Sequence, residues 1–211
     1  MRTETIARTI YKFDELSEHA KETARDWWRQ CENSDFDTEF MYEDFERVAE
    51  ALGVTFRRRD VPLYGGGTRS KARIFWTGFS SQGDGASFEG AYAYVKQSRK
   101  KIREYAPHDS TLHQIADDLF EVQRKHFYRL TATTLQRGRY MHSGCMTVDV
   151  YEDGRDADAN AADEVKSALR SFADWMYSAL EKEYWHRMSA ENVDDSIRAN
   201  EYEFLEDGRI A

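Results

Sequence analysis

The segment Gly78-Phe-Ser-Ser-Gln-Gly-Asp-Gly-Ala-Ser-Phe-Glu-Gly90 is the most distinctive stretch of the sequence, and it organises the predicted fold. It connects and overlaps two runs rich in branched, aromatic and small residues, Ala72–Thr77 and Ser87–Val95, which are typical of strands. Gly83-Asp-Gly85 is a tight-turn signature within it. We therefore predict a β-hairpin whose two strands are joined by this glycine-rich loop.

Helical and strand patterns lie in blocks on either side of this hairpin. Six helices are predicted. The first runs from Glu15 to Cys31 with Asp14 as N-cap, and the second covers Asp37–Leu52 with Gly53 as C-cap. The others cover Lys96–Tyr105, a segment that begins after an N-cap at Asp109 or Ser110, Asp163–Trp185 and Ala190–Ala199. Further strands are predicted at Val54–Val61, Phe127–Gln136, Tyr140–Tyr151 and Glu201–Leu205. Because the blocks do not alternate as βαβ units, the sequence predicts an α+β fold with a mostly antiparallel sheet packed by several helices.

The length and composition favour one intracellular domain. A chain of 211 residues fits a single α+β domain spanning residues 1–211. The two cysteines, Cys31 and Cys145, lie far apart without a metal-ligand spacing, so we expect two buried thiols in a reducing cytoplasm. No apolar run approaches the roughly 18 residues of a membrane span, which predicts a soluble protein.

Charge is distributed unevenly along the chain. Residues 149–211 hold 17 acids and 7 bases, a balance of −10, whereas the other residues hold 22 acids and 23 bases. Two basic clusters flank the glycine loop: Arg57, Arg58, Arg59, Arg69, Lys71 and Arg73, then Lys96, Arg99, Lys100, Lys101 and Arg103. Such asymmetry is consistent either with an interaction surface or with ordinary solvated faces.

The glycine loop is the strongest candidate site in the sequence. Its candidate contact residues are Phe79, Ser80, Ser81, Gln82 and Asp84. In the ligand hypothesis, Arg57, Arg59 and Arg73 hold an anion, and His142 contacts the rest of the ligand from a neighbouring strand. In the alternative, the loop is an ordinary hairpin connection whose side chains satisfy its own backbone.

Signatures of known chemistry are not found in the sequence. The glycine loop matches neither a phosphate-binding P-loop nor a dinucleotide fingerprint. The triplet Gly65–Gly67 is interpreted as a flexible loop between strands, because no helix follows it. The histidines form no ligand pair at helical spacing, and no GxSxG motif is present. We therefore predict no catalytic residues, metal or cofactor.

Three segments carry a resemblance to a known group of proteins. They are Tyr11-Lys-Phe-Asp-Glu-Leu-Ser-Glu-His-Ala-Lys, the QGDGA region of the glycine loop, and Asn200-Glu-Tyr-Glu-Phe with Asp207-Gly208. The chain resembles, nearly end to end, bacteriophage and prophage proteins sometimes labelled "antitoxin of a toxin–antitoxin stability system". This resemblance implies a phage protein that acts in the host cytoplasm by binding host machinery.

Three functional hypotheses follow. The first is a non-enzymatic phage protein that binds a host protein or ribonucleoprotein complex, as an antitoxin-like factor or as an inhibitor of a defence system such as CRISPR or nucleotide signalling. The second is binding or hydrolysis of a nucleotide-like anion at the glycine loop. The third is nucleic-acid binding through the basic clusters, which the overall net charge of −9 opposes.

Overall fold

The computed structural model describes residues 8–32, 36 and 38–211, and the contacts divide the chain into two compact units. The smaller unit contains residues 1–37 and 181–211, and the larger one contains residues 38–180. The helices are α1 (Glu18–Glu32), α2 (Glu39–Leu52), α3 (Ser98–Tyr105), α4 (Ser110–Lys125), α5 (Ala159–Met188) and α6 (Ala190–Ala199). The strands are β1 (Tyr11–Lys12), β2 (Val54–Phe56), β3 (Arg58–Pro62), β4 (Thr68–Ala72), β5 (Ile74–Trp76), β6 (Ala86–Phe88), β7 (Gly90–Ala93), β8 (Leu130–Gln136), β9 (Met146–Glu152), β10 (Arg155–Asp156) and β11 (Glu203–Phe204). These elements confirm the predicted α+β class.

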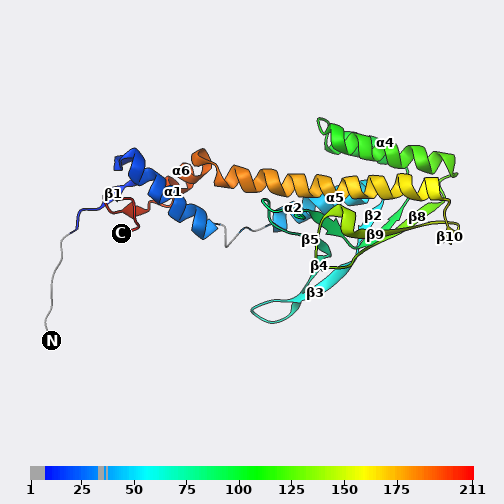
Figure 1. Ribbon diagram of the computed structural model, residues 1–211, viewed down its shortest axis with the longest axis horizontal. Coiled ribbons are helices and arrows are strands. Elements are labelled where there is room, and N and C mark those ends of the chain that lie inside the picture. The colour runs from blue at the N-terminus through cyan, green and yellow to red at the C-terminus, as the bar shows by residue number, and fades with distance from the viewer. Residues whose placement is uncertain (1–7, 33–35, 37) are drawn as a thin grey trace. The chain divides into compact units, whose positions relative to one another are not determined.

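The larger unit is built on a sheet in the order β10-β9-β8-β7-β2, with antiparallel neighbours throughout. Side chains alternate along the strands, so that Leu130, Ala132 and Thr134 of β8 are buried while Thr131 and Thr133 are exposed. This period of two gives the sheet one packed face and one exposed face, as predicted. Figure 1 shows the yellow part of α5 running along the sheet.

The core of the larger unit lies between the packed face of the sheet and its helices. Phe172 of α5 stacks on Phe56 of β2 with ring centroids 6.2 Å apart and meets Phe88 of β6 edge to face at 5.6 Å. Trp175 lies next to Phe172 and meets Phe45 of α2 at 5.6 Å. These rings join α2, α5 and the strands in one apolar core that fixes where the hairpins emerge.

Two predicted strands are each divided into two. Val54–Val61 forms β2 in the five-stranded sheet and β3 in a separate two-stranded hairpin with β4. Ser87–Val95 is likewise divided into β6 and β7. The prediction of continuous strands was wrong because the chain changes sheets at Arg57 and Glu89, where long-range pairing determines the path. In Figure 1 the β3–β4 hairpin extends away from α5.

Helix ends follow local chemistry at most of the expected positions. Gly53 ends α2 with φ +90°, as predicted. Asp109, one of the two predicted caps of α4, accepts a hydrogen bond from Leu112 N at 3.0 Å. Asp14 was wrongly predicted as the cap of the first helix, because it lies in a 3-10 turn over Phe13–Glu15. The helix begins later, and Ser17 Oγ accepts a hydrogen bond from Ala20 N at 3.3 Å. The predicted start of the next helix, at residue 37, lies outside the described residues.

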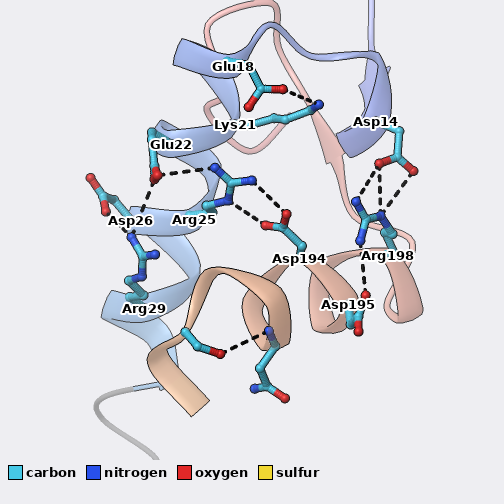
Figure 2. Close-up of polar contacts among 12 residues, drawn as sticks. Asp14, Glu18, Lys21, Glu22, Arg25, Asp26, Arg29, Asp194, Asp195 and Arg198 are labelled. Carbon is cyan, nitrogen blue, oxygen red and sulfur yellow. Dashed lines mark hydrogen bonds and ion pairs between the residues drawn. The ribbon is translucent and has the colours of Figure 1, made fainter. Parts of the chain in front are cut away.

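The smaller unit joins the two ends of the chain. Strand β1 pairs antiparallel with β11, and α1 contacts α6 around a core that includes Phe13 and Phe204, whose rings meet at 6.3 Å. Figure 2 shows the charged contacts beside this core. Arg25 of α1 holds Asp194 of α6 through two hydrogen bonds, Nε–Oδ1 at 2.6 Å and Nη2–Oδ2 at 2.8 Å. This bidentate ion pair links the two helices across a separation of 169 positions in the sequence.

Candidate functional site

The glycine loop connects β5 and β6, which pair over Ile74–Phe88, Phe75–Ser87 and Trp76–Ala86. Asp84 Oδ2 accepts hydrogen bonds from the backbone N–H groups of Ser80 at 3.0 Å and Ser81 at 2.6 Å. These bonds to Ser81 and Ser80 hold the pKa of the Asp84 carboxyl below its usual value. The connection between β5 and β6 therefore uses its one carboxylate, that of Asp84, to satisfy its own backbone.

Phe79 anchors the loop on the larger unit. Its ring stacks on Trp76 with centroids 5.4 Å apart and contacts Tyr177 of α5 at 5.5 Å. The Tyr177 hydroxyl also donates a hydrogen bond to Gly78 O at 2.9 Å. Phe79, predicted as a contact residue for a ligand, therefore packs against the core, while Ser80, Ser81 and Gln82 are exposed at the loop surface.

His142 lies against the glycine loop, as the ligand hypothesis requires, but not within a strand. It precedes a 3-10 turn over Ser143–Cys145, so the strand predicted from Tyr140 begins only at Met146. The backbone approaches so closely that a Cβ on Gly85 would lie 2.5 Å from His142 Cβ. His142 Nε2 is 3.3 Å from Cys145 Sγ, within hydrogen-bonding reach of a thiol.

The cysteines do not behave as predicted. Cys31 is exposed and Cys145 is only partly buried, because the first lies near the end of α1 and the second lies on a surface turn. Cys145 is a free thiol. The contact between Cys145 and His142 places a potential nucleophile beside a potential base at this turn.

The structure brings Arg57 and Arg73 together at the other end of the β5–β6 hairpin from the glycine loop. Arg57 N donates to Glu89 O at 2.7 Å, Arg73 N to Arg57 O at 2.8 Å, and Glu89 N to Arg73 O at 3.0 Å. We call these three residues the strand junction. The buried Glu89 carboxylate lies 2.6 Å from Arg73 Nε and 3.8 Å from Arg57 Nη1. The two arginines therefore neutralise a buried carboxylate. The sequence did contain a sign of this ion pair, because Glu89 is the only charged residue within Ala86–Val95.

Arg59 belongs to the β3–β4 hairpin, which we call the arm. Arg59 is exposed and pairs in register with Lys71. The tip is closed by hydrogen bonds from Leu63 N to Gly67 O and from Gly66 N to Leu63 O, both 3.0 Å long. Positive φ angles at Gly66 and Gly67 permit this turn, and the triplet is the inter-strand loop predicted from the sequence. Tyr64 is fully exposed at the tip, and Leu63 is half-exposed.

The remaining bases of the arm lie beside acids and an aromatic ring of α2. Arg58 Nη1 donates to Glu46 at 2.9 Å, and Arg69 forms a short ion pair with Glu39. Lys71 Nζ lies 4.9 Å from the centroid of the Tyr42 ring. The first basic cluster is therefore largely compensated within the larger unit.

Four of the five bases of the second cluster, all except Lys101, line a groove of about 780 Å³, which we call the α3–α4 groove. It is lined by Tyr94, Lys96, Gln97, Ser98, Arg99, Lys100, Arg103, Glu104, Asp117 and Phe120. The sequence analysis recognised the bases but missed both rings: Phe120 reaches the bases only through the packing of α4 beside α3, and Tyr94 lies on the segment between β7 and α3.

Within the described parts of the chain, no helix has the length and apolar character needed to cross a bilayer. The same residues contain no cluster of three or more side chains arranged to hold a metal ion. A family model described as a domain of unknown function, DUF8835, matches residues 38–190. No curated protein and no solved structure matches the chain.

Proposed function

The chain belongs to the DUF8835 family, and we propose that it is a non-enzymatic protein whose arm docks into a host protein or complex. In this proposal the protein is encoded by a phage and acts in the cytoplasm of the bacterial host. It serves as an antitoxin-like factor or as an inhibitor of a defence system. The phage setting rests on the sequence resemblance described above, and the docking surface rests on the geometry of the arm.

The exposed side chain of Tyr64 at the arm tip carries this proposal. A buried tyrosine ring removes about 150–250 Å² from water, equivalent to about 4–6 kcal/mol before the costs of association. Tyrosine is also one of the residues most often responsible for binding energy at protein interfaces. Tyr64 and Leu63 therefore provide an anchor that is ready to enter an apolar pocket of a partner.

The arm is preorganised for this role. Five residue pairs, from Arg58–Ala72 to Pro62–Thr68, hold its strands in register, and hydrogen bonds close its tip. Since ordering a flexible loop on binding costs free energy, a paired hairpin loses less than an unstructured segment. The strand junction fixes the base of the arm to the sheet.

A protein partner suits the arm better than a nucleic acid. Arg58 and Arg69 are committed to carboxylates of α2, so few cations of the arm remain for phosphate contacts. The anion hypothesis at the glycine loop is also weakened, because Arg57 and Arg73 lie at the strand junction. The Asp84 carboxylate, which a catalytic loop could use as a base, is instead engaged by the backbone of the loop itself.

The proposal is tested by replacing Tyr64. Host proteins are captured with the wild-type chain and with Tyr64→Ser, and each candidate that only the wild type retains is purified for calorimetry. We expect Tyr64→Ser to raise Kd about 30-fold, which corresponds to the roughly 2 kcal/mol typical of an interface anchor. The melting temperature should not fall, because the side chain is fully exposed in the free protein.

Phe127→Ser is the matched control, because Phe127 is also a large exposed aromatic residue of the larger unit but lies outside the arm. It should leave capture and Kd unchanged. Equal binding by wild type and Tyr64→Ser would refute a role for the arm tip.

A further inference from the structure

The α3–α4 groove combines features that the proposed docking function does not require. Its volume, about 780 Å³, lies within the range of sites that bind small molecules. Four bases and two acids line it, so its local formal charge is positive although the whole chain carries −9. Two aromatic rings, Tyr94 and Phe120, lie among these charges.

The aromatic side of the groove is held in an unusual backbone conformation. Tyr128 packs on Tyr94 with ring centroids 4.5 Å apart and lies 6.1 Å from Phe120. Both Tyr128 and the preceding Phe127 have positive φ angles, +62° and +53°, which are rare for bulky residues. Such strain costs roughly 1–3 kcal/mol per residue and is concentrated at functional sites. In this backbone conformation, Tyr128 lies in contact with the Tyr94 ring that lines the groove.

The basic side of the groove retains hydrogen-bonding capacity. Arg99 Nε is 3.6 Å from Asp117 and its Nη1 is 3.8 Å from Glu121, both longer than a hydrogen bond. Lys100 Nζ is likewise 3.6 Å from Glu104. Arg103 differs from these two bases, because it donates to Asp117 Oδ2 at 2.7 Å, much as Arg58 of the arm donates to Glu46 at 2.9 Å.

Two further groups in the groove lack partners. Lys96 has no ion pair with any residue that the structure describes. The hydroxyl of Ser98, in a residue only 9% exposed, has no hydrogen-bond partner within the described part of the chain. Ser98 begins α3, and the N-cap residue Gln97 makes no side-chain capping hydrogen bond. The start of α3 therefore offers donors and a positive helix end to an anion.

We propose that the α3–α4 groove binds a nucleoside phosphate, either as a free nucleotide or as the phosphorylated end of a nucleic-acid strand. The phosphate lies against Lys96, Arg99 and the start of α3, and the base packs on Phe120 and Tyr94. Arg99 is placed to contact both the phosphate and the base of the nucleotide, because its guanidinium lies 4.1 Å from the centroid of the Phe120 ring. Aromatic side chains beside arginine and lysine suit a ligand that carries both an aromatic base and a phosphate.

Calorimetric titration of the full-length chain tests this site. The probes are the common 5′-nucleoside monophosphates and triphosphates, the matching nucleosides, inorganic phosphate, and a short oligothymidylate with and without a 5′-phosphate. We expect at least one nucleotide to bind with a Kd of about 1 mM or tighter, and its nucleoside and inorganic phosphate each to bind at least about tenfold more weakly. If the phosphorylated oligonucleotide binds about tenfold more tightly than every mononucleotide, the natural ligand is a strand end, and otherwise it is a free nucleotide.

The variants assign the binding to the groove. Lys96→Gln and Arg99→Gln should each weaken nucleotide binding by about fivefold or more, since each removes one charge contact to phosphate. Phe120→Leu should weaken the nucleotide and leave inorganic phosphate unaffected. Arg137→Gln is the control, because it removes one exposed positive charge outside the groove and should change nothing. Lys96 is exposed, so its variant remains informative if Phe120→Leu fails to fold.

Three results would overturn the proposal: no binding by any nucleotide at about 5 mM, binding equally strong for inorganic phosphate, or binding that survives both charge variants. The outcome does not depend on the arm, because Tyr64→Ser should bind the nucleotide as the wild type does. Failure of the groove and failure of the arm are therefore separate results.

Discussion

Replacing Glu89 with glutamine tests whether the strand junction stabilises the larger unit. The Glu89 side chain is 7% exposed and faces Arg73, which is 31% exposed. Glu89→Gln keeps the shape of the side chain but removes the charge opposite Arg73 and Arg57. A charged hydrogen bond contributes about 1.5–3 kcal/mol, and because Arg73 is partly exposed, we expect a loss of about 2 kcal/mol.

This loss should be measured by urea unfolding of the full chain and by its melting temperature. A cost of about 2 kcal/mol corresponds to a fall of about 6 °C for a unit of this size. The variant Glu43→Gln is the control, because the ion pair between Glu43 and Arg47 is long, 4.0 Å, and well exposed. It should change stability by less than about 0.5 kcal/mol.

A double-mutant cycle with Arg73→Met then isolates the interaction between Glu89 and Arg73. We expect a coupling free energy of at least about 1 kcal/mol. The reasoning is wrong if Glu89→Gln is no more destabilising than Glu43→Gln, or if the cycle gives no coupling.

Two further predictions concern packing and pH. Gly85→Ala should destabilise the chain by about 2 kcal/mol in urea unfolding, because the new Cβ would lie 2.5 Å from His142 Cβ. Gly65→Ala is the control and should have almost no effect, because the space around Gly65 is open. Equal effects of the two variants would contradict the close approach at Gly85. The Arg25 guanidinium, which hydrogen-bonds Asp194, holds the pKa of that carboxyl below its usual value. The stabilisation is therefore complete above the unfolded pKa of about 3.9 and is lost as pH falls through the folded value, so Asp194→Asn should flatten the acid side of a stability–pH curve, and an unchanged slope would contradict it.

Helices were predictable from sequence because their signals are local. Apolar residues recur at helical spacing, and Gly53 and Asp109 mark helix ends by backbone conformation and side-chain capping that need no distant partner. The main departure was the start of α1. There the buried Phe13 places a 3-10 turn where a helical turn was expected.

Strand paths were less predictable because they depend on pairing between distant segments. A period of two identifies a strand but does not show that the chain changes partners at Arg57, Arg73 and Glu89. Knowledge of these positions also decides the candidate site. From the sequence alone, Arg57 and Arg73 were predicted to hold an anionic ligand. Once the strand paths are known, they are seen to be the partners of the buried Glu89 carboxylate.

The α3–α4 groove shows the same limit of sequence reasoning. Its basic residues form one visible cluster, but Phe120 and Tyr94 reach it from a neighbouring helix and from the segment after β7. His142 was expected near the glycine loop and lies there, although in a turn instead of a strand. The sequence thus indicated that His142 lies near the glycine loop but not that it lies in a turn.

The strand junction also has a consequence for how this protein can be engineered. The arm leaves the sheet at Arg57 and returns at Arg73, and the hydrogen bond between these residues is only 2.8 Å long. The arm thus begins and ends at neighbouring points of the sheet. The length and the tip residues of the arm can therefore be changed without changing the register of the strands in the five-stranded sheet. The turn between β3 and β4 is therefore the place where insertions and deletions should be tolerated, whereas the strands of the arm are held to α2 by Arg58 and Arg69.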